Sequence, residues 1–212
     1  MIENYINKVI QGDCLEVMKE IPDKNVDMVL TSPPYDNLRD YKGYTFNFEG
    51  IAQEIYRVLK DGGVCVWIVG DATIKGSETG TSFKQALYFK EIGFNLHDTM
   101  IYEKAQISFP DSVRYYNCFE YMFVFSKGMV KTFNPIKKIN PNAGKFIKPT
   151  KRGKDGVLVK DSGYLLNKKA PDFSIIRNIW RYTTGRASST DKIAIGHPAI
   201  FPEKLAEDHI VS

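Results

Sequence analysis

The pattern of apolar residues along the first 128 positions changes repeatedly between continuous runs and helical spacing. Short apolar or alternating runs bounded by turn residues are typical of strands, whereas apolar residues every three or four positions are typical of amphipathic helices. The predicted strands are Lys8–Gln11, Val26–Thr31, Val64–Val69, Phe94–Glu103 and Glu120–Ser126. The predicted helices are Leu15–Ile21, Phe46–Lys60 and a third from Thr81 or Ser82 to Gly93. This order predicts a doubly wound α/β sheet with helices on both faces and an antiparallel strand at one edge.

The pattern changes at Lys127, and up to about residue 172 Gly, Pro, Asn, Lys and Arg dominate without an amphipathic period. Residues 129–192 contain 15 Lys and Arg against 4 Asp and Glu, whereas the rest of the chain contains 14 against 21. This asymmetry predicts a basic segment that meets a polyanion, although a solvated lysine-rich loop has the same composition. Within the segment Ile175–Tyr182 alternates like a strand, and a last helix follows Pro202.

Length and composition narrow the class of protein. The 212 residues suffice for one hydrophobic core and a small additional module. No apolar run approaches the roughly 20 residues of a membrane helix, and the first residues lack a signal-peptide pattern, so we expect neither feature. The cysteines are odd in number and far apart, which predicts a reducing cytoplasm and no disulfide framework: they are Cys14, Cys65 and Cys118. The three histidines have no metal-ligand spacing with them, so we expect no metal.

The strand Val26–Thr31 ends abruptly at Ser32-Pro33-Pro34-Tyr35. Two successive prolines donate no backbone hydrogen bond, so the strand stops and a rigid extended turn follows its carboxyl end. Ligands of open α/β sheets bind at this end of the strands. A Pro-Pro loop that merely closes a strand, with a tyrosine packed against it, would explain the same residues without any chemistry.

Thr31-Ser-Pro-Pro-Tyr35 after an apolar strand resembles the catalytic motif of the amino-group DNA methyltransferases, which transfer a methyl group from S-adenosylmethionine to adenine N6 or cytosine N4. His197-Pro-Ala-Ile-Phe-Pro-Glu-Lys-Leu205 resembles the segment that lines the methionine end of the donor in permuted members. The order of catalytic motif, basic segment and His-Pro helix is similar to that of the β class found in restriction-modification systems. The resemblance implies an incomplete Rossmann-like sheet, divided into a catalytic α/β part (1–128), a target-recognition segment (129–192) and a returning part (193–212).

The resemblance also implies roles for particular residues. Ser32, Pro33, Pro34 and Tyr35 would be catalytic: the Ser32 hydroxyl and the Pro33 carbonyl accept hydrogen bonds from the base amine and aim its lone pair at the donor methyl. Tyr35 would stack on a base rotated out of double-stranded DNA. The implied donor-binding residues are Asp13, Cys14, Thr31, His197, Pro198 and Phe201, although Asp13 would serve equally as a plain helix cap. The expected DNA contacts, chiefly to phosphates, are Arg39, Arg177, Arg181 and Arg186.

One departure from the family pattern concerns the donor site. The Phe-x-Gly-x-Gly turn that should follow His197-Pro198 is absent, and no Gly-x-Gly occurs among the 212 residues. We therefore expect an incomplete sheet, weak binding of the donor by this chain alone, and a complementing C-terminal fragment as a candidate partner.

Three functions remain open. The first is DNA amino-methylation, with cytosine N4 favoured over adenine N6 because neutral acceptors such as Ser32 are commoner among the N4 enzymes. The second is a non-enzymatic DNA-binding remnant or one half of a split methyltransferase. The third is methylation of RNA or of protein glutamine, which Ser32 disfavours because relatives of that kind carry Asn before Pro-Pro-Tyr.

Overall fold

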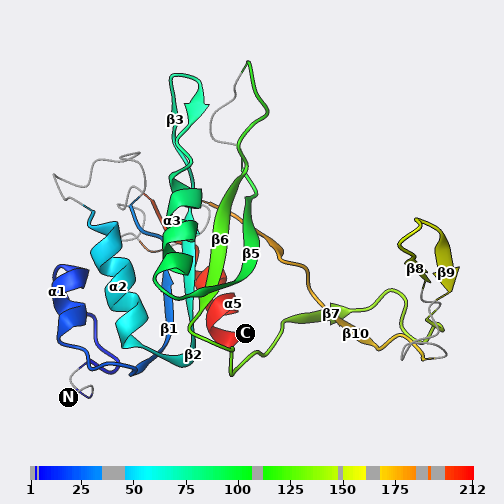
Figure 1. The fold of residues 1–212 in the computed structure, drawn as a ribbon, viewed down its shortest axis with the longest axis horizontal. Coiled ribbons are helices and arrows are strands. Elements are labelled where there is room, and N and C mark those ends of the chain that lie inside the picture. The colour runs from blue at the N-terminus through cyan, green and yellow to red at the C-terminus, as the bar shows by residue number, and fades with distance from the viewer. Residues whose placement is uncertain are drawn as a thin grey trace. The chain divides into compact units, whose positions relative to one another are not determined.

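The computed structural model describes residues 3, 5–34, 46–106, 112–147, 150–160, 168–184, 191 and 199–212. The chain divides into two compact units (Figure 1). Unit 1 consists of Met1–Phe133 and Asn178–Ser212, and unit 2 consists of Asn134–Arg177. Each unit has its own sheets, so we describe them separately.

Unit 1 contains a mixed five-stranded sheet in the order β1-β2-β6-β5-β11. Its strands are β1 (Val26–Thr31), β2 (Leu59–Val69), β5 (Asn95–Lys104), β6 (Phe119–Ser126) and β11 (Ile179–Tyr182). Strand β1 is parallel to β2 and β11 is parallel to β5, whereas β6 is antiparallel to both of its neighbours. The predicted α/β class is confirmed, but the prediction of an antiparallel strand at the edge is wrong because β6 lies in the middle of the sheet.

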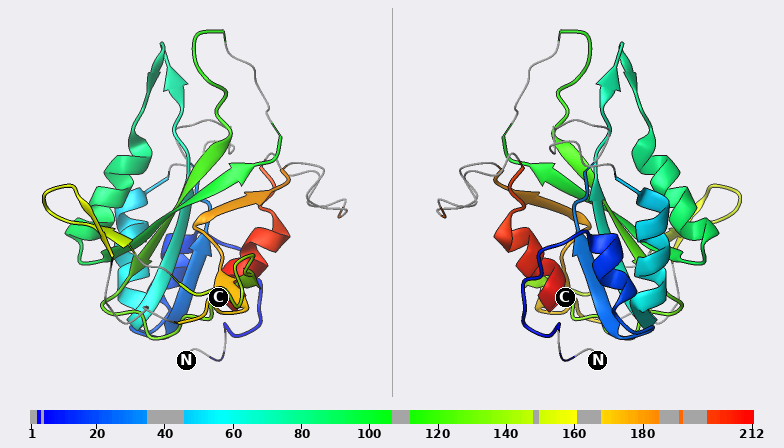
Figure 2. Two further views of the ribbon diagram at one scale, coloured as in Figure 1. Left: turned by 90° about the vertical axis from the view of Figure 1, so that its right-hand side faces the viewer. Right: turned by 90° about the vertical axis from the view of Figure 1, so that its left-hand side faces the viewer.

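Helices cover both faces of this sheet (Figure 2). The helices are α1 (Cys14–Lys19), α2 (Phe48–Val58), α3 (Thr81–Glu91) and α5 (Glu203–Val211). Helices α2 and α3 pack on one face, where Trp67, Phe89 and Phe125 are fully buried. Helix α5 lies on the other face, where Leu205 is buried and the ring of His209 lies 4.7 Å from that of Trp180. Successive side chains of β6 point to opposite faces of the sheet. Phe125 therefore faces α3, while Met122 contacts His209 on the other face.

Aromatic side chains fill the core beneath α2 and α3. The rings of Phe89 and Phe125 stack at 4.4 Å, and Trp67 meets Phe89 edge to face at 5.1 Å. The Trp67 indole N–H donates to Gln85 at 2.8 Å, which satisfies the one polar atom of this buried ring. The most closely packed part of unit 1 is therefore the layer between α3 and the centre of the sheet.

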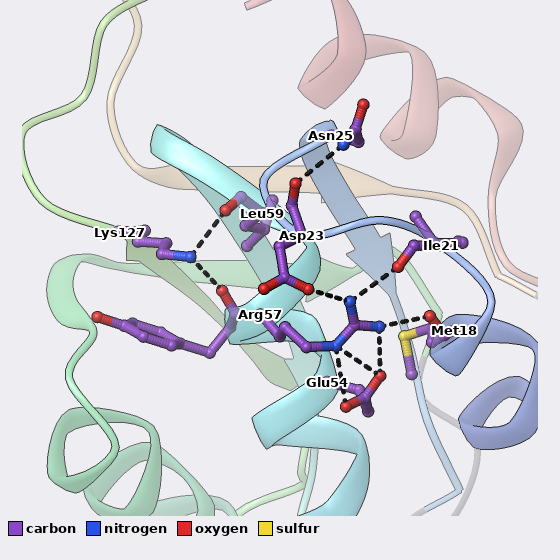
Figure 3. A network of polar contacts seen from close by, with 9 residues as sticks. Met18, Ile21, Asp23, Asn25, Glu54, Arg57, Leu59 and Lys127 are labelled. Carbon is purple, nitrogen blue, oxygen red and sulfur yellow. Dashed lines mark hydrogen bonds and ion pairs between the residues drawn. The ribbon is translucent and has the colours of Figure 1, made fainter. Parts of the chain in front are cut away.

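Two buried or half-buried cations join α2 to its surroundings (Figure 3). Arg57 donates to the carbonyl oxygens of Met18 and Ile21 at 2.7 and 2.8 Å, and it also pairs with Glu54. Lys127, just after β6, donates to the carbonyl oxygens of Tyr56 and Leu59 at 2.6 and 2.9 Å, at the carboxyl end of α2. These contacts fix α1 and the end of β6 to α2, because cations complement the carbonyl groups left unpaired at helix ends.

Unit 2 contains only two-stranded sheets among its described residues. Strand β7 (Lys137–Ile139) pairs with β10 (Phe173–Ile175), and β8 (Thr150–Arg152) pairs with β9 (Leu158–Lys160). A similar short hairpin, β3 (Thr73–Ile74) with β4 (Ser77–Glu78), occurs in unit 1. The five-stranded sheet is thus a feature of unit 1 alone in the part of the chain that the structure describes.

Two strand predictions are wrong. Lys8–Gln11 is not a strand, and its apolar residues Val9 and Ile10 are exposed. A strand needs a hydrogen-bonded neighbour, and none of the described strands pairs with this segment. The predicted strand Ile175–Tyr182 is instead two strands, because Ile175 pairs with Lys137 in unit 2 whereas Ile179 pairs with Ile101 in unit 1.

Candidate functional site

The carboxyl ends of β1, β2 and β5 lie at one end of the five-stranded sheet, since these strands run in the same direction. Four segments therefore leave the sheet at this end, because β11 is parallel to β5 and its last residue, Tyr182, lies opposite Lys104. Ser32–Pro34 follows β1, residues 70–80 follow β2, the connection from β5 to β6 follows Lys104, and the fourth segment follows Tyr182. Because the ends of parallel strands form the usual ligand-binding edge of α/β sheets, this end is the candidate site.

Ser32, Pro33 and Pro34 form the corner that follows β1. The last registered pair of the ladder is Thr31 with Trp67, so the prolines lie beyond the strand as the sequence predicted. The Pro33 ring is buried and Pro34 is half-buried, whereas Ser32 is exposed. The corner is therefore anchored by its proline rings and presents the serine to solvent, which is the arrangement that a ligand-binding hydroxyl requires.

Strand β1 lies at an edge of the sheet, and this leaves the Ser32–Pro34 corner accessible to solvent. Among the described strands, β1 pairs with β2 and with no strand on its other side. Its residues are mostly half-buried, in contrast to the run Cys65–Val69 of β2, which is buried throughout. The sheet edge next to Ser32 is therefore not covered by another strand in the part of the chain that the structure describes.

Asp71 organises the segment that follows β2, and the sequence reading did not single it out. Its carboxylate accepts hydrogen bonds from the backbone N–H and the hydroxyl of Ser82, and from the Thr79 hydroxyl at 3.3 Å. This fixes the first turn of α3 and the base of the β3–β4 hairpin. Partial burial of Tyr121, together with the nearby carboxylates of Asp71 and Glu78, raises the pKa of its hydroxyl. The signal in the sequence was an acidic residue two positions after the end of a buried strand.

The predicted donor-binding residues are only partly described. Asp13 caps α1, where its carboxylate accepts from the Leu15 N–H at 2.8 Å, and both Asp13 and Cys14 are exposed. Thr31 is half-buried at the end of β1, and Phe201 is half-buried just before α5. The helix-cap role of Asp13 is thus observed, and its carboxylate is also accessible to a ligand. The donor-binding roles of these residues stay predictions.

The predicted DNA-binding arginines are likewise partly described. Arg177 is exposed at the end of unit 2. Arg181 is exposed on β11 and lies 3.8 Å from the Glu103 carboxylate, a distance at which a solvated ion pair contributes little. The other predicted site residues lie outside the described residues: Tyr35, Arg39, Arg186, His197 and Pro198.

Three searches of the described residues bear on the class of protein. None of the helices in those ranges combines the length and apolar character needed to cross a bilayer. No group of three or more His, Cys, Asp or Glu side chains there is arranged to hold a metal ion. Cys14, Cys65 and Cys118 form no disulfide, and burial raises the pKa of Cys65.

The fold is that of a methyltransferase. The PvuII DNA methyltransferase (cytosine-N4-specific) superposes with a TM-score of 0.60, covering 94% of this chain and 67% of that chain at 20% sequence identity. The model of the DNA methylase family matches residues 26–212, and the chain belongs to this family. The predicted membership of the amino-group DNA methyltransferases is thereby confirmed.

The sequence is also similar to those of two curated methyltransferases, which agrees with this family assignment. The chain is 61% identical over 200 residues to the orphan methyltransferase M.BamHII of Bacillus amyloliquefaciens, covering 92% of this chain and 74% of that protein. It is 26% identical over 220 residues to the Type II methyltransferase M.BglII of Bacillus subtilis, covering 99% of this chain and 57% of that protein. The similarity therefore includes the basic unit 2 as well as the sheet.

Proposed function

We propose that this chain takes part in site-specific methylation of double-stranded DNA in the cytoplasm, at the exocyclic amine of a base rotated out of the duplex. The observation that carries the proposal is the corner after β1, in which buried Pro33 fixes the backbone while Ser32 stays exposed. Family membership gives that corner its chemistry. A packed serine with no access from solvent would have removed the basis for this reaction.

The corner would act by positioning hydrogen-bond acceptors. The amine of a nucleobase is a weak nucleophile because its lone pair is delocalised into the ring. The Ser32 hydroxyl and the Pro33 carbonyl would accept its two hydrogens and hold the nitrogen tetrahedral, with the lone pair directed outward. Two prolines give this backbone little freedom, so the acceptors need not reorganise during the reaction. No strong base is required, because the product amine loses its proton readily after transfer.

S-adenosylmethionine, when bound, supplies the electrophilic methyl group. The exposed carboxylate of Asp13 is suited to accept hydrogen bonds from ribose hydroxyls or the adenine amine, and Thr31 lies at the end of β1 beside the corner. The 212 residues contain no Gly-x-Gly turn for the donor, so we infer that this chain alone binds it weakly. Titration calorimetry that gave a micromolar dissociation constant for this chain alone would contradict that inference.

DNA would be held mainly through its phosphates. Unit 2 contains 11 Lys and Arg against 3 Asp and Glu, and Arg177 and Arg181 are exposed. Contacts of this kind position the duplex without reading its sequence, and they weaken as salt rises. Cytosine N4 is the favoured target, since Ser32 supplies a neutral acceptor where an aspartate would supply a charged one.

The test is transfer of labelled methyl groups to DNA at millimolar donor, followed by digestion to nucleosides. We expect N4-methylcytosine, and a loss of about 100-fold or more in the rate for Ser32→Ala, as for removal of one positioned hydrogen-bonding group in other enzymes. DNA affinity should change by less than about twofold, because Ser32 is one contact among many.

Thr99→Ala serves as the matched control, because Thr99 is an exposed hydroxyl residue in the middle of β5, away from the end of the sheet that carries Ser32, and should retain the wild-type rate. Equal rates for wild type and Ser32→Ala would overturn the proposed role of the corner. DNA binding with no transfer by the wild-type chain, even at millimolar donor, would favour a DNA-binding remnant or a split enzyme. N6-methyladenine as the product would overturn only the choice of base.

A further inference from the structure

The connection between β5 and β6 carries exposed aromatic side chains at the same end of the sheet as Ser32. In its described part, residues 112–118, Tyr115 is 99% exposed, Val113 is 86% exposed and Tyr116 is 46% exposed. The core aromatic residues Trp67 and Phe125 of the same unit are fully buried, whereas Phe83 on α3 is 50% exposed. Apolar groups held in water make no favourable packing contacts, so a cluster of them at a loop tip indicates a surface that meets a partner.

A second projecting element supports this loop. The β3–β4 hairpin turns at Lys75 and Gly76, which both have positive φ as its two-residue turn requires. Arg114 donates to the Gly76 carbonyl at 2.8 Å and so joins the two projections. Figures 1 and 2 show both rising from the same end of the sheet. Two cationic residues therefore lie beside the aromatic ones, on a support that limits the movement of the loop.

The spacing of the strands fits the dimensions of a DNA duplex. Strands β2 and β6 separate β1 from β5, so the loop leaves the sheet roughly 10 to 15 Å to the side of the Ser32 corner at about 4.8 Å per strand. Neighbouring base pairs are about 3.4 Å apart along the duplex. A base that reaches Ser32 has left the stack across a groove about 8.5 Å deep, so the gap behind it and the base faces next to that gap would lie at about the distance of this loop. The chain leads toward unit 2 from the other end of the sheet, where β6 ends.

We propose that Tyr115 stacks on a nucleobase exposed when the target base leaves the duplex. This inference rests on the proposed function, because it requires DNA at the Ser32 end of the sheet. Rotation of a base out of the stack leaves neighbouring base faces uncovered, and an inserted aromatic or apolar side chain can cover one of them. Val113 and Tyr116 provide further apolar surface beside it, while Arg114 and Lys75 face the phosphates.

The shape of the loop favours DNA over a second protein. A stable protein interface covers about 800 Å² on each partner, which a narrow projection of a few residues does not supply. A projecting tip with an aromatic side chain and neighbouring cations instead matches the way in which proteins insert into a groove and contact single bases.

The test uses duplexes with a gap already present, so that neither the target sequence nor the donor has to be known. The full chain is titrated with an intact duplex and with the same duplex carrying one abasic site. We expect the abasic duplex to bind at least about fivefold more tightly, as one base–aromatic contact provides. Tyr115→Ala should abolish this preference and Tyr115→Phe should keep it, since the ring does the stacking.

Leu87→Ala is the control, because Leu87 is a similarly exposed apolar residue on α3 and should leave the preference unchanged. An abasic preference that survives Tyr115→Ala, or wild-type binding without any preference, would overturn the role of Tyr115 while leaving the proposed methylation intact. Failure to bind either duplex would overturn both. A change in oligomeric state caused by Tyr115→Ala would assign the loop to contacts between copies of the chain and would also overturn it.

Discussion

Two phenylalanines show how differently the two units use apolar residues. Phe125 of unit 1 is fully buried and stacks on Phe89 at 4.4 Å. Phe173 of unit 2 lies opposite Ile139 in the β7–β10 ladder, yet it is 58% exposed and Ile139 is 76% exposed. The same residue type in a strand is a core residue in one unit and a surface residue in the other.

The difference follows from the number of layers. Unit 1 has helices on both faces of its sheet, whereas the described sheets of unit 2 have two strands each, and isolated pairs of strands are marginally stable in water. Unit 2 is also net positive, with 11 Lys and Arg against 3 Asp and Glu, whereas the rest of the chain holds 18 against 22. The comparison indicates that unit 1 provides the stability, while unit 2 keeps its side chains available to a partner.

The largest effect should come from removing the two phenylalanines in turn. Phe125→Ala should lower the free energy of unfolding by about 3 to 5 kcal/mol, because it leaves a cavity beside Phe89. Phe173→Ala should lower it by less than about 1 kcal/mol, because that ring is already largely solvated. Urea unfolding followed by far-ultraviolet circular dichroism reports on the strands of both units, whereas tryptophan fluorescence reports on unit 1 alone, which contains Trp67 and Trp180. Equal losses for the two variants would refute the contrast between the units.

Acid should affect the two units differently. Burial lowers the pKa of His209 from 6.5 to about 4, with Asp208 opposing the shift. The unfolded chain therefore takes up this proton first as the pH falls, so the stabilisation is complete above pH 6.5 and is lost toward pH 4. The stabilisation by neutral His209 amounts to about 3 kcal/mol. It concerns unit 1 alone, because no histidine occurs in residues 134–177. Stability measured between pH 7 and 4 should fall less steeply in His209→Gln, and an unchanged slope would contradict the assignment.

A smaller effect is expected at Arg57. Arg57→Ala leaves the carbonyl groups of Met18 and Ile21 without their cationic donor, which should cost about 1.5 to 3 kcal/mol in urea unfolding. Lys19→Ala is the matched control, because Lys19 pairs with Glu16 on the exposed side of α1 and its removal should have no measurable effect. If both variants unfolded like the wild type, α1 would contribute little to the stability of unit 1.

The hydrophobic pattern predicted where helices and strands begin and end better than it predicted which strands pair with each other. Val26–Thr31 is a strand with the predicted ends, and the predicted α2 and α3 lie within about two residues of the observed ones. The central place of β6 was missed because strand pairing is non-local, although the uninterrupted run Tyr121–Phe125 is typical of a strand covered on both faces. Lys8–Gln11 has the composition of a strand, but composition alone cannot show that a partner is missing.

Some residues of the candidate site could likewise be predicted from the sequence, whereas others could not. The corner at Ser32–Pro34 was predictable because a buried strand followed by two prolines has few other interpretations. Asp71 and Tyr115 were not found, because their significance depends on contacts and exposure that distant parts of the chain decide. Asp71 acts through Ser82, and Tyr115 stands out only because it is 99% exposed at the tip of a loop.

The anchoring of Lys127 has a consequence for how such chains can evolve. Its amine is fixed on the end of α2 and its backbone pairs with Gly62 and Gly63, just before the chain leads into residues 134–177. The chain rejoins the sheet as β11, so its departure and return lie on the two strands that flank β5. Recombination could therefore exchange the intervening stretch between related genes, as one cassette, without cutting through any strand of the five-stranded sheet.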